Sequence, residues 1–270
     1  MPLLVWIILF TAVGGIASAA FAGVYLLLPE ATGQRLLPHL ISYATGALLG
    51  AALLALLPDA VEGVGRAGAH SIGLAMVAGL GIFFVIEKLV LWWHTHGNGH
   101  AHGHDHGHSH DHDHSHDHGR DAASGVLVII GDSIHNALDG VLIAAAFLTS
   151  FPLGLVTTFA VAAHEIPHRV GDFAILVHSG MSRGRALVMN MATGLTSIIG
   201  GIAAYFGLQR TVGVLPYALA LAAAGFLYIA VAGLIPGLQR RADPRTSLAQ
   251  VVLMGLGVAT IAWAESLAHQ

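Results

Sequence analysis

Long apolar stretches alternate with short polar ones along this chain. A helix needs about 20 mostly apolar residues to cross the hydrocarbon core of a bilayer. Six stretches without Asp, Glu, Lys or Arg approach or exceed this length: residues 1–29, 36–58, 67–86, 186–209, 211–239 and 246–264. Two further helices are expected between 122 and 179, where a Thr-Ser-Phe-Pro turn at 149–152 divides an apolar region that also carries charges.

We therefore predict an all-α polytopic membrane protein with eight transmembrane helices. Their expected ranges are roughly 3–28, 38–61, 70–94, 122–149, 153–179, 183–206, 213–236 and 247–268. The N-terminal stretch lacks a basic region and a small-residue cleavage site, so we interpret it as the first span and not as a signal peptide.

Lys and Arg residues at the helix ends predict the orientation, because they concentrate on the cytoplasmic side of membrane proteins. With the N-terminus outside, the outer ends carry only Arg66 and Arg210. The cytoplasmic ends then carry Arg35, Lys88, Arg120, Arg183, Arg185, Arg240, Arg241 and Arg245. Both termini are thus expected outside the cytoplasm. The chain would be one integral membrane domain, with helices 1–3 in residues 1–93, a cytoplasmic loop at 94–121 and helices 4–8 in 122–270.

The composition fits a membrane protein and excludes several functions. Mean hydropathy is +0.73 and 10% of residues are charged, against about 25% in soluble chains. The 11 Lys and Arg form no basic patch, so no nucleic-acid partner is expected. The absence of Cys excludes a disulfide scaffold, thiolate zinc sites and thiol catalysis. The 19 His residues are unusual and need an explanation.

The loop at 94–121 contains twelve of these histidines, mostly alternating with Gly, Asp or Ser. Imidazole binds Zn, Cu and Ni, and His-rich tracts are typical of metal binding. The candidate loop ligands are His102, His104, His106, His108, His110, His112, His114, His116 and His118. An inert linker is the plain alternative, and a role in transport is a separate question.

Ionisable residues inside the fourth and fifth helices are the strongest functional candidates. A charged side chain at the centre of a membrane helix costs about 2.5–3.5 kcal/mol on insertion scales, so it suggests a functional site. At 100° per residue, each helix gathers its polar residues on one face. The fourth helix contributes His135, Asn136 and Asp139, and the fifth contributes His164, Glu165, His168 and Asp172. Nitrogen and oxygen ligands of this kind suit a borderline divalent metal.

Neighbouring residues refine this candidate site. Pro167 lies inside the fifth-helix motif, where it removes a backbone hydrogen bond and should kink the helix. Asn190 in the sixth helix is either a further ligand or a packing hydrogen bond. A purely structural polar cluster between helices is the plain alternative for the whole set.

Two other functional classes share parts of this pattern. His164-Glu165-x-x-His168 matches the HExxH motif of zinc metalloproteases, and intramembrane proteases combine it with a Leu-Asp-Gly segment, present here at 138–140. Pro167 inside the motif and the order of the two segments disfavour this alternative. A cation diffusion facilitator, which exports metal, also has a His-rich loop, but such proteins usually have six spans and a hydrophilic C-terminal domain.

The two motifs together resemble the signature of the ZIP (Zrt/Irt-like) divalent metal transporters. They read His-Asn-Ala-Leu-Asp-Gly at 135–140 and His-Glu-Ile-Pro-His-Arg-Val-Gly-Asp at 164–172, closest to the branch marked by HExPHExGD. The likeness covers essentially the whole chain, including the His-rich loop and the Glu87-Lys88 pair. It implies import of Zn²⁺ into the cytoplasm, with Fe²⁺, Mn²⁺ and Cd²⁺ as further substrates. It also implies a metal between helices 4 and 5, often a two-metal centre, and a homodimer.

The sequence departs from the family pattern at two places. Arg169 stands where this branch usually has Glu, and Ala51 and Ala55 stand where members often have Asp and His. A guanidinium stays protonated, so we expect Arg169 to replace a second ion. The site would then hold one tightly bound metal per chain, not two.

The sequence thus predicts a transporter, not an enzyme, with metal ions and the lipid bilayer as partners. The resemblance implies alternating access by movement of helices 1, 4, 5 and 6 against the others. The expected location is the cell (inner) membrane as a multi-pass protein, or an organelle membrane in a eukaryote.

Overall fold

The computed structural model describes residues 2–96, 117–239 and 244–268, and these residues form helices and no strand. The expected loop ligands from His102 to His116 lie outside the described residues, and His118 falls in the first turn of a helix. Within the described residues, the all-α class predicted from the sequence is confirmed.

The first span is a helix of three consecutive parts, α1 (Leu3–Ala12), a π-helical segment (Val13–Ala17) and α2 (Ser18–Tyr25). It is followed by α3 (Glu30–Gly50), a second π-helical segment (Ala51–Leu56) and α4 (Leu57–His96). Gly65 has a φ of 68° and a ψ of 173° inside α4. Because glycine reaches positive φ without a steric penalty, α4 is kinked there into two helical parts.

The remaining helices are α5 (Asp117–Thr149), α6 (Phe151–His178), α7 (Arg183–Leu208), α8 (Leu215–Tyr228), α9 (Ile235–Gln239) and α10 (Pro244–Ala268). A short 3₁₀ turn (Val212–Val214) precedes α8, and a π-helical segment (Ile229–Leu234) joins it to α9. Ser150 caps α6, since its hydroxyl accepts a hydrogen bond from the Leu153 N–H at 3.2 Å. Pro167 lies within the continuous helix α6.

Six stretches of the described residues are long and apolar enough to cross a membrane: Leu3–Tyr25, Ala31–Leu89, Val128–Thr149, Arg183–Leu208, Leu215–Gln239 and Thr246–Leu267. The second contains the kink at Gly65. Helix α6 is not among the six, because the polar side chains of its second half lower its hydropathy. Helix ends also differ from prediction. Helix α3 begins at Glu30 and α5 at Asp117, because charged residues end an apolar pattern without ending a helix.

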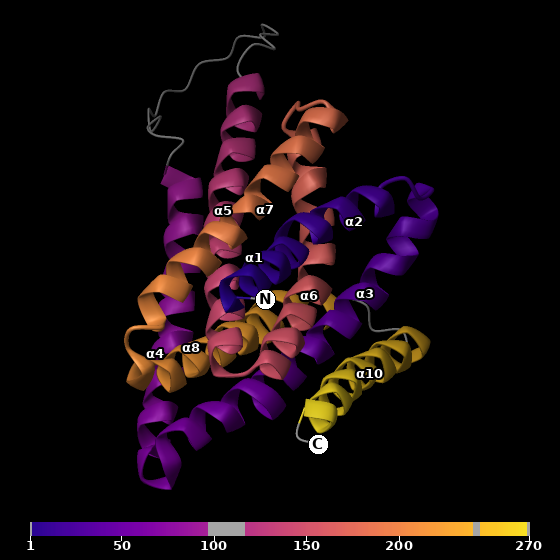
Figure 1. Ribbon diagram of the computed structural model, residues 1–270. Helices are drawn as coiled ribbons and strands as arrows, with labels where there is room; N and C mark the ends of the chain where they lie inside the picture. Colours follow the sequence, from indigo (N-terminus) through magenta and orange to yellow (C-terminus); the bar gives the residue numbers. More distant parts are fainter. Residues whose placement is uncertain (1, 97–116, 240–243, 269–270) are drawn as a thin grey trace, which may run out of the picture.

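Contacts divide the helices into two groups. In the first, α5 packs against α6 and α7, and α1 against α5 and α7; in the second, α4 packs against α8, and α3 against α10 (Figure 1). Helix α6 joins the groups through contacts with α3 and α10.

Helices α5 and α7 approach each other closely because glycines line their contact. A Cβ atom on Gly140 would collide with the backbone carbonyl of Ser197, and one on Gly200 with the backbone of Ala137. Small residues allow such backbone contact between membrane helices. This contact fixes the position of α5, which carries three of the seven predicted ligands.

Candidate metal centre

The polar face of α5 meets the polar face of α6 in the interior of the first helix group. Residues three and four positions apart share one face of a helix, which explains why each helix gathers its polar side chains. The buried ones include Asp132, Asn136 and Asp139 of α5 and His164, Glu165, Arg169 and Asp172 of α6. Helix α7 adds the buried Asn190 and Thr193.

Three of these side chains and the partly exposed His135 place one potential ligand atom each around a common centre: His135, Asp139, His164 and Glu165. We call them the buried group. His135 Nε2 lies 3.4 Å from His164 Nε2 and 3.4 Å from Glu165 Oε1. Asp139 Oδ2 lies 3.5 Å from His164 Nε2 and 3.8 Å from His135 Nε2.

These separations are close to those of a tetrahedral zinc site. With Zn–N and Zn–O bonds of about 2.0–2.1 Å, neighbouring ligand atoms in a tetrahedron are about 3.3 Å apart. The contacts of 3.4–3.8 Å need only a few tenths of an ångström of contraction. Moreover, Asp139 Oδ2 and Glu165 Oε1 are buried and have no hydrogen bond within the described residues. The buried group can therefore enclose one divalent cation.

A hydrogen bond orients the imidazole of His164 so that one ring nitrogen faces the other ligand atoms of the buried group. Its Nδ1 lies 3.1 Å from the carbonyl oxygen of Ala160. A carbonyl only accepts hydrogen bonds, so Nδ1 carries the proton and Nε2 presents its lone pair to the buried group. Metal-binding histidines are typically fixed in this way through their other nitrogen. Phe226 of α8 packs edge-on against the ring, with the centroids 6.2 Å apart.

A second set of ligand atoms comes from Asp132, His168 and Asp172, which we call the outlying group. His168 Nδ1 lies 2.9 Å from Asp172 Oδ2 and 3.9 Å from Asp132 Oδ1. Both aspartates are buried, but the His168 side chain is 40% exposed, against 1% for His164. The two groups adjoin, because the rings of His135 and His168 stack with their centroids 5.2 Å apart.

Arg169 is fully buried and bonds to both groups. Its Nε donates to Glu165 Oε2 at 2.8 Å, and its Nη1 donates to Asp132 Oδ2 at 2.6 Å. Further donations go to the Asn136 Oδ1, to the Asn190 side chain and backbone oxygens at 2.9 Å, and to Thr193 Oγ1 at 2.5 Å. A buried charge is tolerated when its hydrogen-bonding capacity is used in this way.

The formal charge of this region is strongly negative. Asp132, Asp139, Glu165 and Asp172 face the single guanidinium of Arg169, which gives a sum of −3 when the carboxylates are ionised and the histidines neutral. An excess of buried negative charge inside a membrane helix pair is costly. A bound divalent cation reduces it to −1.

The structure distributes the predicted ligands over three places. His135, Asp139, His164 and Glu165 lie together, whereas His168 and Asp172 join Asp132. The amides of Asn136 and Asn190 bond to Arg169; Asn136 Nδ2 also donates to Asp132 Oδ1 at 2.9 Å, and Asn190 Nδ2 donates to the Arg169 carbonyl at 2.9 Å.

Asp132 is the residue that the sequence reasoning left out of the candidate site. It lies three positions before His135 and four before Asn136, a spacing that puts all three on one helix face. Its place in the site could have been inferred from the sequence, because it is an ionisable residue at this spacing in an apolar helix. Ala51 and Ala55, by contrast, are fully buried in the apolar core and bring no ligand.

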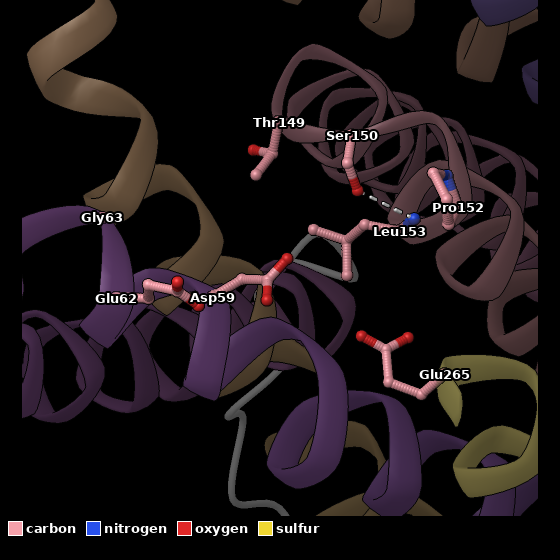
Figure 2. Close-up of a pocket in the computed structure, with 8 residues that line it drawn as sticks. All are labelled: Asp59, Glu62, Gly63, Thr149, Ser150, Pro152, Leu153 and Glu265. Carbon is pink, nitrogen blue, oxygen red and sulfur yellow. Dashed lines mark hydrogen bonds between the residues drawn. The ribbon is translucent and has the colours of Figure 1, made fainter. Parts of the chain in front are cut away.

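A cavity of about 510 Å³ lies at the opposite end of α5 and α6, beside the turn at Ser150. Its lining includes three carboxylate residues, Asp59, Glu62 and Glu265. Figure 2 shows Asp59 of α4 and Glu265 of α10 projecting toward the same space. The end of the helix pair away from Asp132 and Asp172 is thus hollowed and acidic.

Membrane-length helices around a buried His and carboxylate cluster define a polytopic membrane protein that handles divalent metal ions. The family model described as ZIP Zinc transporter matches residues 3–264. The zinc transporter ZIP13 of Pongo abelii is 33% identical over 248 residues, covering 86% of this chain and 68% of that protein. ZIP13 of Mus musculus is 34% identical (86% and 71% covered), and the zinc transporter zipt-7.1 of Caenorhabditis briggsae is 32% identical (88% and 71%). The chain therefore belongs to the ZIP zinc transporter family, which confirms the resemblance predicted from its motifs.

Proposed function

We propose that this protein, a multi-pass membrane transporter with Zn²⁺ as its substrate, carries zinc into the cytoplasm through the buried group. The proposal is supported by the geometry of the buried group, whose ligand atoms have a spacing close to that of a tetrahedral zinc site. Two of these atoms, Asp139 Oδ2 and Glu165 Oε1, are buried and accept no hydrogen bond within the described residues. Zinc prefers this combination of imidazole and carboxylate ligands. Fe²⁺, Mn²⁺ and Cd²⁺ are further candidate substrates.

The proposed topology has eight spans with both termini outside. Counting α6 as a span and dividing the stretch Ala31–Leu89 at Gly65 raises the six apolar stretches to eight. The excess of Lys and Arg on one side supports a cytoplasmic His-rich loop. The acidic cavity at Ser150 then faces outward, where its charge would attract cations. We also propose that the protein forms a homodimer. Its expected location is the cell membrane, or an organelle membrane in a eukaryote.

The two alternatives considered from the sequence are not favoured. A metalloprotease would require His164 and His168 on one metal and Glu165 free as a general base. Here the two histidines belong to different groups, and Glu165 Oε2 accepts from Arg169. The family match across residues 3–264 argues against a cation diffusion facilitator.

Uptake into proteoliposomes tests the proposal. Purified protein is given Zn²⁺, Mn²⁺, Fe²⁺ or Cd²⁺ separately, and zinc uptake is compared for the unsubstituted chain and for His164→Ala and His168→Ala variants. We expect zinc uptake by the unsubstituted chain and background uptake by both variants. His178→Ala is the matched control, because His178 is an exposed residue at the end of the same helix. Normal zinc uptake by a His164→Ala/His168→Ala double variant would refute the assignment.

A further inference from the structure

We infer that the hydroxyl of Thr157 in α6 contacts the cation on its way from the acidic cavity to the buried group. The inference rests on the proposed function, because it assigns the part of the route that precedes the buried group. Thr157 is 0% exposed, and its Oγ1 has no hydrogen-bond partner within the described residues. Because a buried hydroxyl without a partner is unfavourable, such a group calls for a functional explanation.

Other threonines of this protein satisfy their hydroxyls within their own helices. Seven of them donate to a backbone carbonyl three or four positions earlier: Thr11, Thr45, Thr149, Thr158, Thr193, Thr196 and Thr260. Thr158, the residue after Thr157, donates to the Gly154 carbonyl at 2.8 Å. This bond to the preceding turn is common for threonine in a helix. The Thr157 hydroxyl is not used in this way and stays available to an ion.

Thr157 lies on the line that joins the cavity to the buried group. At 100° per residue, Leu153, Thr157 and His164 lie within about 40° of one another around α6. Leu153 lines the cavity (Figure 2), and His164 belongs to the buried group. At 1.5 Å per residue, Thr157 is about 6 Å beyond Leu153 and about 10 Å before His164. Its hydroxyl is thus a polar group in the section between them.

This section of α6 is closed in the structure. Leu153 and Val161, the apolar neighbours of Thr157 on this side of the helix, are at most 1% exposed. The more exposed side chains lie at and beyond the buried group: His135 is 23% exposed and His168 is 40% exposed. Accessible surface near the buried group therefore lies away from the cavity. An ion that enters from the cavity has to part apolar side chains, which offer it no ligand.

A hydroxyl suits an ion that passes through such a section. Its oxygen has two lone pairs and carries no charge, and zinc accepts oxygen ligands. It can replace a water molecule that the ion loses when it leaves the cavity. It attracts the ion less than the carboxylates of Asp139 and Glu165 do, since it lacks their negative charge. The ion would therefore pass Thr157 and stay at the buried group.

Removing the hydroxyl without changing the shape of the side chain tests this role. Thr157→Val removes it, Thr157→Ser keeps it, and Thr158→Val is the matched control at the neighbouring buried position. We expect the initial rate of Zn²⁺ uptake into proteoliposomes to fall several-fold in Thr157→Val alone. The unfolding temperature of Thr157→Val should not fall, because no hydrogen bond is lost. A fall in stability together with uptake would indicate a structural role and overturn the inference.

A thiol at the same position provides a second measurement. The chain contains no Cys, so Thr157→Cys and Thr158→Cys each carry one thiol. A small cationic methanethiosulfonate reagent is added to each full-length variant in proteoliposomes, with and without saturating Zn²⁺. We expect labelling to block zinc uptake in Thr157→Cys, Zn²⁺ to slow that labelling, and Thr158→Cys to be unaffected.

The outcomes separate the entry route from the proposed function. Normal zinc uptake by Thr157→Val, or an unreactive thiol in a Thr157→Cys protein that takes up zinc, would overturn the role of Thr157 alone. If Thr157→Val yields no protein, the labelling of Thr157→Cys decides. Absence of zinc uptake by the unsubstituted chain would instead refute the proposed function.

Discussion

The two halves of this helical protein bury different chemistry. The half formed by α5, α6 and α7 buries carboxylates, the imidazole of His164 and a guanidinium. The half formed by α3, its π-helical continuation and α8 buries mostly small apolar side chains: Ala47, Leu48, Ala51, Ala52, Ala55, Leu219, Ala220, Ala222 and Ala223. Directional hydrogen bonds through Arg169 fix α5, α6 and α7 relative to one another. Contacts between small apolar side chains impose no such direction.

This difference assigns separate tasks to the halves. The polar half supplies every ligand atom in the two metal-ligand groups of the described residues. The apolar half supplies an apolar packing surface, in which Phe226 packs against the ring of His164. The family resemblance implies movement of the first, fourth, fifth and sixth spans against the others. A hydrogen-bonded polar unit packed against mostly apolar side chains would suit such a movement.

Removing the charge of Arg169 should have the largest effect on stability. Arg169→Met leaves Asp132 and Glu165 buried without their cationic partner, and breaking a buried ion pair costs about 3–5 kcal/mol. We expect a loss of this size in the free energy of unfolding, measured in detergent without metal. Arg185→Met, at an end of α7 outside the cluster, is the control. An Arg169→Met protein as stable as the unsubstituted chain would show that the network does not hold the polar half together.

Placing an acidic residue in the apolar half should lower the free energy of unfolding by nearly as much as the Arg169→Met substitution. Ala51→Asp restores a residue type common in relatives, but Ala51 is fully buried among apolar side chains. We expect a loss of about 2.5–3.5 kcal/mol in the free energy of unfolding. Ala51→Ser, which adds no charge, should cost less. If zinc binding increases in Ala51→Asp without loss of stability, the apolar half is a latent metal site and the contrast between the halves is wrong.

Reversing the charge at position 169 should change the number of bound ions. Arg169→Glu adds a carboxylate between the two groups, so we expect tightly bound zinc to rise from one to two per chain. Elemental analysis after dialysis measures it, with both proteins carrying Ser in place of the loop histidines. A ratio near two in the protein with Arg169, unchanged by Arg169→Glu, would contradict the replacement of a second ion by the guanidinium.

The smallest effect on transport is expected from the His-rich tract. Deleting residues 97–119 should leave zinc uptake in place and lower the number of loosely bound zinc ions, because the tract adds no ligand to the buried group. Zinc binding by the intact tract should fade below about pH 6, since imidazoles with a pKa near 6.5 become protonated. Loss of uptake in a correctly inserted deletion variant would make the loop part of the conduction path.

The sequence predicted the helices and the pairing of α5 with α6, but not how the site divides. Helical spacing places His135 and Asp139 on one face, and His164 and His168 on another, without specifying which members meet across the interface. His168 lies one turn further along α6 than His164, where it contacts Asp172 of the same helix and Asp132 of α5. The bonds of Arg169 to α5 and α7 depend on three helices at once, so no spacing within one helix reveals them.

The fixed charge of Arg169 also affects the electrical work of transport. Moving one elementary charge through a potential of 100 mV involves about 2.3 kcal/mol. A carrier that returns empty must move its own uncompensated carboxylates back across the field. Glu in place of Arg169 would change the formal sum of the empty cluster from −3 to −5. The guanidinium is thus a permanent counter-ion that never leaves the carrier, and it reduces the voltage dependence of the return step.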